Sequence, residues 1–224
     1  RTPASRWRRC WRAVEGIDLY ASRISHTEDA MGQAAADLRM SMAQFLDWEA
    51  AQAQRHEFVA GEVFAMAGAD DAHVTVALNV AMALRRHLAG TPCRVYMSDM
   101  KLAVRESQGV YYPDVMVTCS EADRASALVK SEPKLLVEVL SPSTAAFDRG
   151  DKFADYRRLA SLQEYALVDP KTRRSDVDGK GADDLWVLHP ADAGQSLVLS
   201  SVALEIDAQT LFAEVDARDQ RAAR

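Results

Sequence analysis

Two acidic residues near the middle of the sequence interrupt apolar runs. Asp114 follows Pro113 at the start of an apolar stretch, and Glu138 lies inside the apolar run 135–140. A lone carboxylate in such a run is costly to desolvate unless it is paired or binds a cation. Mg²⁺ is commonly held by one or two carboxylates, with waters and phosphate oxygens completing its shell. We therefore expect Asp114 and Glu138 to be metal ligands for Mg²⁺, with Mn²⁺ as a substitute.

Each acid also has a simpler structural interpretation. Asp114 could form a turn after Pro113 at the start of a strand. Glu138 could be a buried carboxylate that pairs with an arginine such as Arg149. Residues 110–118 and 135–140 both have strand patterns, and Asp114 and Glu138 each share a pleat face with alternate residues of their own strand. If the two strands pair, the carboxylates converge at one end of a sheet. A metal ion there could polarise a phosphoryl oxygen and activate an attacking water.

A lysine close to the same oxygen would stabilise developing charge or help to activate the water. Lys134 faces the same side as Glu138 but lies four positions earlier, roughly 13 Å away at about 3.3 Å per strand residue. Lys152 begins a helical pattern, and the turn 141–150 is long enough to fold that helix over the strand end. We therefore prefer Lys152, although an ordinary surface lysine would look the same. His73 could contact substrate or water, or could simply cap a helix.

Composition limits the class of protein. The 224 residues are 48% apolar and carry a formal charge of −6, which argues against a broad basic face that coats nucleic acid. Local basic clusters could still grip phosphates, or could be solvated surface; they are Arg85–Arg86, Arg157–Arg158 and 171–174. Every apolar run is shorter than the about 18 residues of a membrane span, so a soluble protein is expected.

The three cysteines, Cys10, Cys93 and Cys119, lack the CxxC spacing of a zinc site and cannot all pair. This spacing argues against a disulfide framework and favours a reducing cytoplasm. No convincing Ser/His/Asp set accompanies Ser141 or Ser143, which argues against serine hydrolase chemistry.

The pattern predicts one main domain. Residues 1–40 are basic and are expected to be a disordered or artefactual extension, with a nucleic-acid-binding arm as the alternative. Residues 41–215 form the expected domain, and 216–224 form a tail. Helical periodicity covers 41–57, 73–88 and 151–160, and a hairpin over 58–66 turns at Ala60–Gly61. Strands are predicted at 93–97, 101–104, 110–118, 135–140, 165–170, 185–188, 197–199 and 202–204. The fold class is therefore α/β (α+β), with a mixed β-sheet core flanked by helices and additional C-terminal strands.

Several of these segments together resemble one known family. They are Pro113–Asp114, the run 137–144, the helix carrying Asp148, Lys152 and Tyr156, and the strand 164–170. This combination resembles the Uma-two family of restriction endonucleases, within the PD-(D/E)XK nuclease superfamily. Gly61–Glu62 followed by His73 resembles the N-terminal half of that family, and the resemblance covers about 41–212. It implies a restriction-endonuclease-like fold and Mg²⁺-dependent phosphodiester hydrolysis, with Asp114 and Glu138 as metal ligands.

The sequence departs from the superfamily pattern at Leu140, where a lysine normally stands two positions after the glutamate. The resemblance implies that the lysine has moved to the following helix, which again selects Lys152. Glu62 resembles the additional acidic residue of the superfamily, although its expected place is a hairpin and not a helix.

The expected function is that of a metal-dependent endonuclease that cleaves nucleic acid, with DNA as the expected substrate, through metal-activated water. Asp114, Glu138, Lys152 and Glu62 are its candidate catalytic residues. The alternative is a catalytically inactive nuclease-like fold that binds nucleic acid or a protein, which the acidic charge and Leu140 favour. A homodimer would suit the cleavage of both strands.

Overall fold

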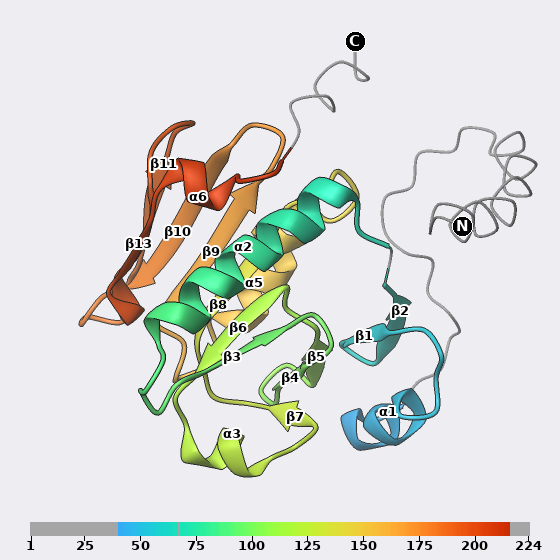
Figure 1. Ribbon diagram of the computed structural model, residues 1–224. Helices are drawn as coiled ribbons and strands as arrows, with labels where there is room; N and C mark the ends of the chain where they lie inside the picture. The colour runs from blue at the N-terminus through green and yellow to red at the C-terminus, as the bar shows by residue number, and fades with distance from the viewer. Residues whose placement is uncertain (1–39, 67, 216–224) are drawn as a thin grey trace, which may run out of the picture. The chain divides into compact units, whose positions relative to one another are not determined.

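The computed structural model describes residues 40–66 and 68–215. The expected extension 1–40, apart from Met40, and the expected tail 216–224 lie outside these residues. Figure 1 shows the described helices and strands along the chain. The helices are α1 (Met42–Glu49), α2 (Asp71–His87), α3 (Glu121–Ala125), α4 (Ala145–Phe147), α5 (Phe153–Tyr156) and α6 (Ala208–Leu211), with a π-helical turn at Asp148–Lys152 and a 3₁₀ turn at Ser200–Val202. None of the described helices has the length and apolar character needed to cross a membrane.

The strands form two larger sheets and one small one. The first sheet has the order β2-β1-β5-β4-β7, the second β11-β10-β9-β8-β6-β3, and β12 pairs with β13. The bounds are β1 (His56–Val59), β2 (Glu62–Ala65), β3 (Arg94–Met97), β4 (Lys101–Val104), β5 (Gly109–Tyr111), β6 (Val115–Thr118), β7 (Val129–Lys130), β8 (Pro133–Val139), β9 (Glu164–Asp169), β10 (Arg174–Lys180), β11 (Trp186–Ala191), β12 (Leu197–Leu199) and β13 (Leu204–Ile206). Because β8 runs parallel to β9 and antiparallel to β6, the second sheet is mixed, as the sequence predicts.

The six-stranded sheet is covered on both faces. Successive side chains of β6 and β8 point to opposite faces, so each strand contributes to two cores. Val115 and Val137 pack in the core that includes α2, whereas Met116 and Leu136 pack with Tyr156 of α5. This double burial confirms the prediction that the strand carrying Glu138 is central. A polar group at its end is consequently shielded from solvent by helices on two sides.

The N-terminal helix is shorter than predicted. Helical periodicity was expected over 41–57, but α1 ends at Glu49 and His56 begins β1. The buried carboxylate of Glu49 accepts hydrogen bonds from the backbone N–H of His56 and from the hydroxyl of Tyr112, so the chain turns back on the helix. The predicted hairpin is confirmed, and its turn at Ala60–Gly61 has φ angles of 52° and 96°. Such angles favour glycine, which the second position supplies.

The predicted strand 110–118 is divided between the two sheets. Its first part is β5, in the five-stranded sheet, and its second part is β6, in the six-stranded sheet. The break falls at 112–114, where Pro113 has no backbone N–H to donate to a strand ladder. Asp114 therefore lies at the junction of the two sheets, immediately before β6.

Three further differences lie C-terminal to β8. The helix expected at 151–160 begins earlier, at Ala145, and passes through the π-helical turn before α5. The strand β10 was not predicted, because most of its residues are polar and it is recruited by pairing with β9 and β11. The last predicted strand, 202–204, is shifted to Leu204–Ile206.

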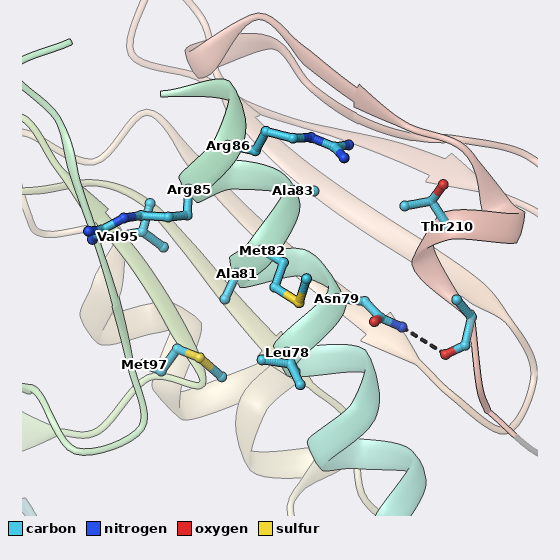
Figure 2. A pocket seen from close by; sticks show the side chains of 11 residues that line it. Leu78, Asn79, Ala81, Met82, Ala83, Arg85, Arg86, Val95, Met97 and Thr210 are labelled. Carbon is cyan, nitrogen blue, oxygen red and sulfur yellow. Dashed lines mark hydrogen bonds between the residues drawn. The ribbon is translucent and has the colours of Figure 1, made fainter. Parts of the chain in front are cut away.

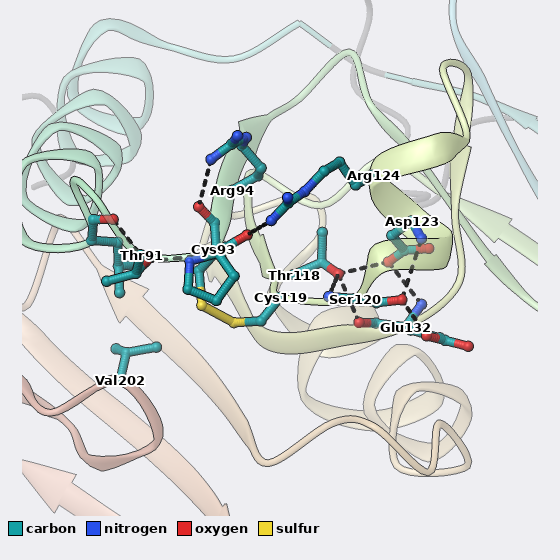
Figure 3. Close-up of a disulfide and its surroundings, with 12 residues drawn as sticks. Thr91, Cys93, Arg94, Thr118, Cys119, Ser120, Asp123, Arg124, Glu132 and Val202 are labelled. Atoms are coloured by element: carbon teal, nitrogen blue, oxygen red, sulfur yellow. Dashed lines mark hydrogen bonds between the residues drawn. A yellow bond between two sulfur atoms is a disulfide. The ribbon is translucent and has the colours of Figure 1, made fainter.

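A disulfide joins Cys93 and Cys119, which corrects the expectation from cysteine spacing (Figure 3). β3 and β6 are antiparallel, with Arg94 opposite Thr118. The next positions outward are the two cysteines, so the strand register brings together residues that lie 26 positions apart. The cytoplasmic location inferred from the cysteines stays a prediction.

We expect the denatured protein to show two more thiols after reduction than before it, because Cys93 and Cys119 are bonded to each other. A thiol titration with a chromogenic disulfide measures this count directly. Replacing both Cys93 and Cys119 by serine should lower the free energy of unfolding by about 3 kcal/mol, the loop-closure contribution for a loop of this size. Three thiols without reduction would contradict the disulfide.

Candidate active site

Asp114 and Glu138 lie side by side at the end of the strand pair β6–β8. Val115 is opposite Val137 in this antiparallel pair, which places Asp114 across from Glu138. The backbone N–H of Asp114 donates to Oε2 of Glu138 at 3.2 Å. In return, the N–H of Val139 donates to Oδ2 of Asp114 at 2.8 Å. Each carboxylate is thus held by the backbone of the strand that carries the other, in the arrangement expected from pleat parity.

Glu138 is the more buried of the two acids, with a side chain 3% exposed. Burial raises the pKa of its carboxyl well above the usual range, although the charge of Lys152 acts in the opposite direction. Its oxygens accept hydrogen bonds from the hydroxyl of Tyr156 at 3.0 Å and from the N–H of Asp114. These donors stabilise the ionised form of Glu138 and so act against the effect of burial.

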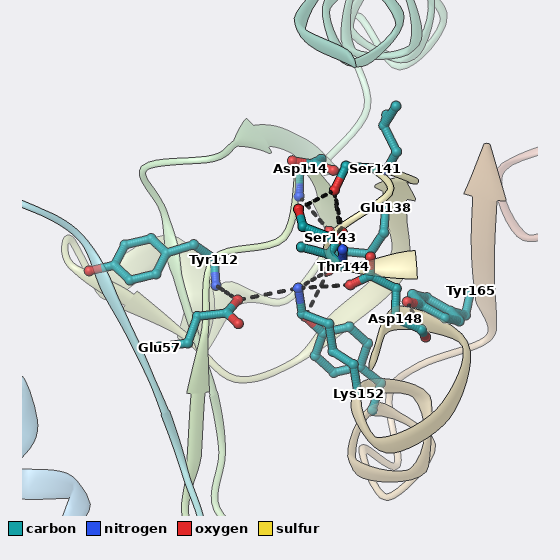
Figure 4. Close-up of polar contacts among 12 residues, drawn as sticks. Glu57, Tyr112, Asp114, Glu138, Ser141, Ser143, Thr144, Asp148, Lys152 and Tyr165 are labelled. Atoms are coloured by element: carbon teal, nitrogen blue, oxygen red, sulfur yellow. Dashed lines mark hydrogen bonds and ion pairs between the residues drawn. The ribbon is translucent and has the colours of Figure 1, made fainter. Parts of the chain in front are cut away.

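Lys152 reaches the same place from the π-helical turn Asp148–Lys152 (Figure 4). Its Nζ lies 3.1 Å from Oε1 of Glu138, 3.2 Å from Oε1 of Glu57 and 3.4 Å from Oδ1 of Asp148. Burial by itself would lower the pKa of Lys152, but these three carboxylates outweigh burial and raise it well above the usual range. Lys152 is therefore a protonated, buried cation and not a surface lysine.

Glu57 and Asp148 also belong to the cluster, although neither is among the site residues predicted from the sequence; Asp148 enters there only as part of the family resemblance. Asp148 lies one π-helical turn before Lys152, and its side chain is buried. Glu57 lies on β1 and also accepts a hydrogen bond from the N–H of Tyr112 at 3.3 Å. Extending the predicted hairpin by two residues would have placed Glu57 on a strand. The helical prediction for 41–57 includes Glu57, so its place on β1 was missed.

Glu62 is not brought to this cluster. It begins β2, is exposed, and lies opposite Val59 in the hairpin. Within the described part of the chain its side chain makes no ion pair. Among the glutamates of this hairpin, Glu57 is the one that contacts Lys152.

His73 connects helix α2 to the site. Its Nε2 lies 3.1 Å from Oδ2 of Asp114, and its backbone N–H donates to the helix-capping carboxylate of Asp70 at 2.8 Å. Burial lowers the pKa of His73, but the hydrogen bond and charge of Asp114 outweigh this effect and raise it. His73 is thus both a residue of a capped first turn and a direct neighbour of a candidate metal ligand.

The other candidates from the sequence lie in separate contacts. Arg149, the alternative partner of Glu138, pairs with Asp176 at 2.6 Å instead. Leu140, at the position where the superfamily has lysine, is buried in the core that also contains Tyr156.

The charges at the site suit a divalent cation. Four carboxylates, those of Glu57, Asp114, Glu138 and Asp148, surround a single lysine and one histidine. Negative charge is therefore in excess at a shielded position, which a bound cation would offset. No three His, Cys, Asp or Glu side chains in residues 40–66 and 68–215 converge closely enough to hold a metal ion by themselves. The two carboxylates of Asp114 and Glu138 nevertheless fit Mg²⁺, because this ion needs only one or two carboxylates when water and phosphate supply its other ligands.

Comparisons with known proteins agree with this fold. The model of the Uma2 family, described as "Putative restriction endonuclease", matches residues 42–211. Two uncharacterized proteins of Synechocystis sp. are each 34% identical, one over 78% of this chain and 92% of its own length, the other over 66% and 85%. The crystal structure of a "putative nuclease belonging to DUF820" from Anabaena variabilis superposes with a TM-score of 0.66 at 14% identity, covering 79% of this chain and 99% of that one. The last likeness shows that this chain shares the mixed α/β fold of that protein.

Replacing Lys152 by methionine should lower the free energy of unfolding by about 3–5 kcal/mol, because three carboxylates would lose their shared counter-charge. Urea unfolding followed by circular dichroism measures the loss. The matched control is Lys171→Met, at an exposed turn position, which should change stability by less than about 0.5 kcal/mol. Equal stability of the two variants would mean that the lysine cluster contributes nothing to the fold.

Proposed function

The chain belongs to the Uma2 family, and on this premise we propose that it is a Mg²⁺-dependent endonuclease that hydrolyses phosphodiester bonds of DNA. Family and fold support nuclease-like function, and the proposal adds the metal, the substrate and the residues. The observation that carries it is the convergence of Asp114 and Glu138 with the buried ammonium of Lys152.

Asp114 and Glu138 are the residues that would hold Mg²⁺. When bound, Mg²⁺ would polarise a phosphate oxygen and lower the pKa of a water molecule. Oδ2 of Asp114 already accepts from Val139 and lies against His73, whereas Oδ1 has no partner within the described residues. A carboxylate has about four acceptor sites, so capacity for a cation remains. Tyr156 and the N–H of Asp114 keep the Glu138 carboxylate in a fixed orientation.

Lys152 acts as a charge stabiliser in this proposal. Its raised pKa makes it a poor proton acceptor, so it is not the general base. A fixed ammonium in a shielded site instead stabilises negative charge that develops on a phosphate oxygen or on the leaving oxygen. The carboxylates of Glu57 and Asp148 hold the ammonium in place for this role. His73 is a positioning residue, because it contacts Asp114.

Supercoiled plasmid incubated with Mg²⁺ or Mn²⁺ should be nicked or linearised by the wild-type protein. Asp114→Asn and Glu138→Gln should each lower the cleavage rate by about 10²–10³-fold, the typical cost of removing one electrostatic contact in a reaction centre. Gel electrophoresis of the plasmid over time provides the rate. Chelation of the metal should abolish cleavage by the wild type.

Two comparisons make this cleavage test specific. Glu106→Gln changes an exposed turn residue and should cleave as the wild type does. Glu57→Gln should slow cleavage more than Glu62→Gln, because only Glu57 contacts Lys152. If Asp114→Asn, Glu138→Gln and the wild type cut equally, the assignment fails. If none cuts, the alternative of a non-catalytic binding module is favoured.

Mg²⁺ should also stabilise the folded protein independently of any cleavage. At a Mg²⁺ concentration about ten times Kd, linkage predicts about 1.4 kcal/mol of added stability. Differential scanning calorimetry with and without Mg²⁺ measures the shift, and Asp114→Asn should remove it while Glu106→Gln retains it. The same shift in Asp114→Asn would place the metal elsewhere.

A further inference from the structure

Helix α2 has two apolar faces, and only one of them packs into the core of the domain. Val76, Val80 and Leu84 are fully buried against the sheet. On the opposite side, large apolar side chains recur every four residues and remain open to solvent. They are Val74, Leu78 and Met82, which are 53%, 47% and 62% exposed. A continuous apolar row of this kind is unusual on a monomer surface and is typical of an interaction site.

This row borders a groove of about 590 Å³ (Figure 2). One wall is β3, with Val95 and Met97, and the other includes Thr210 and Ala213 around the end of α6. Asn79 fixes the second wall, because its side-chain amide donates to the carbonyls of Leu211 and Ala213 at 3.2 and 2.9 Å. Leu78 and Met82 themselves line this groove, so the row of Val74, Leu78 and Met82 forms a ridge on α2 between the two walls.

The charges at the two ends of the ridge are opposite. Asp71 lies in the first turn of α2 and Arg85 in the last turn, and both are exposed. Neither is in an ion pair within the part of the chain that the structure describes. Each lies seven residues from Leu78, which is close to two turns of about 3.6 residues, so both share its side of the helix. Val74 and Met82 likewise lie four residues to either side of Leu78.

These residues are spaced symmetrically about Leu78, so the row is complementary to a second copy of itself related by a two-fold rotation. If a second copy packs its α2 antiparallel to the first, with Leu78 at the symmetry axis, Val74 meets Met82 and Asp71 meets Arg85, each pair twice. Rows of residues four apart are the ridges that interdigitate in common helix packing, at axial distances of about 8–10 Å. A twofold interface needs such self-complementarity, because the same patch serves both subunits.

We propose that the α2 ridge is the dimer interface of this protein, formed with a second copy of the same chain. Nucleic acid fits the ridge poorly, since phosphates would meet apolar side chains and the carboxylate of Asp71. The charge pattern specifies the antiparallel orientation, because a parallel pair would place like charges together. The proposal does not depend on nuclease activity. It would place the two copies of His73 about 15 Å apart along the helix direction, at about 1.5 Å per residue.

Analytical ultracentrifugation over a range of protein concentrations tests the interface. The full chain should be a dimer, and Leu78→Asp should raise the dimer dissociation constant at least a hundredfold. Since Leu78 is solvent-exposed in the single chain, circular dichroism and the melting temperature of the monomer should change little. The matched control is Leu128→Asp, which alters a 72% exposed leucine outside the ridge and should remain dimeric.

Charge reversal tests the orientation separately. Asp71→Arg and Arg85→Asp should each weaken the dimer at least tenfold, because like charges would then face each other. The double variant Asp71→Arg/Arg85→Asp should recover most of the lost affinity. A monomeric wild type, a dimer unaffected by Leu78→Asp, or a double variant no better than either single one would each overturn the proposal.

Discussion

The arrangement of the site depends on the buried ammonium of Lys152. A buried charge is costly to desolvate, and here the cost is offset by three carboxylates within 3.4 Å. These carboxylates come from β1, from β8 and from the π-helical turn, so the ion cluster connects both larger sheets to the helix that follows β8. Losing any one contact would leave charge without compensation. The same group that a nuclease would use for its chemistry is thus also a constraint on the fold.

The carboxylates exceed the cations, and this imbalance gives the site its chemical character. The carboxylate of Glu138 accepts a hydrogen bond from the N–H of Asp114, and the carboxylate of Asp114 accepts one from the N–H of Val139. These two bonds across the strand pair hold the acids together despite their repulsion. The imidazole of His73 contacts Asp114 from one side, and the ammonium of Lys152 offsets the charge of Glu138 from the other. A negatively charged position between His73 and the ammonium of Lys152 is well suited to a hard cation and an anionic substrate.

The lysine of this site lies on the helix that follows β8, and the strand position two after Glu138 is apolar. Leu140, two positions after Glu138, packs into the core with Tyr156 and leaves that strand position apolar. Lys152 approaches Glu138 from the facing helix, where a π-helical turn places it beside Asp148. Such turns often occur at functional sites, because the extra residue redirects side chains. Under the proposed function, the charge-stabilising lysine is therefore defined by its position in space and not by one motif spacing.

By itself, the sequence determined the features that depend on local alternation. The burial of β8, the hairpin at Ala60–Gly61 and helix α2 follow from patterns within single segments. Alternation along each strand puts Asp114 and Glu138 on one face once β6 and β8 pair. The selection of Lys152 over Lys134 followed from distance along one strand. Contacts between distant segments were not accessible in this way. Only the tertiary structure decided that Glu57 and not Glu62 meets Lys152, that His73 lies against Asp114, and that Cys93 bonds to Cys119. The physical reason is that sheet register and chain reversal set these contacts, and both result from packing of the whole domain.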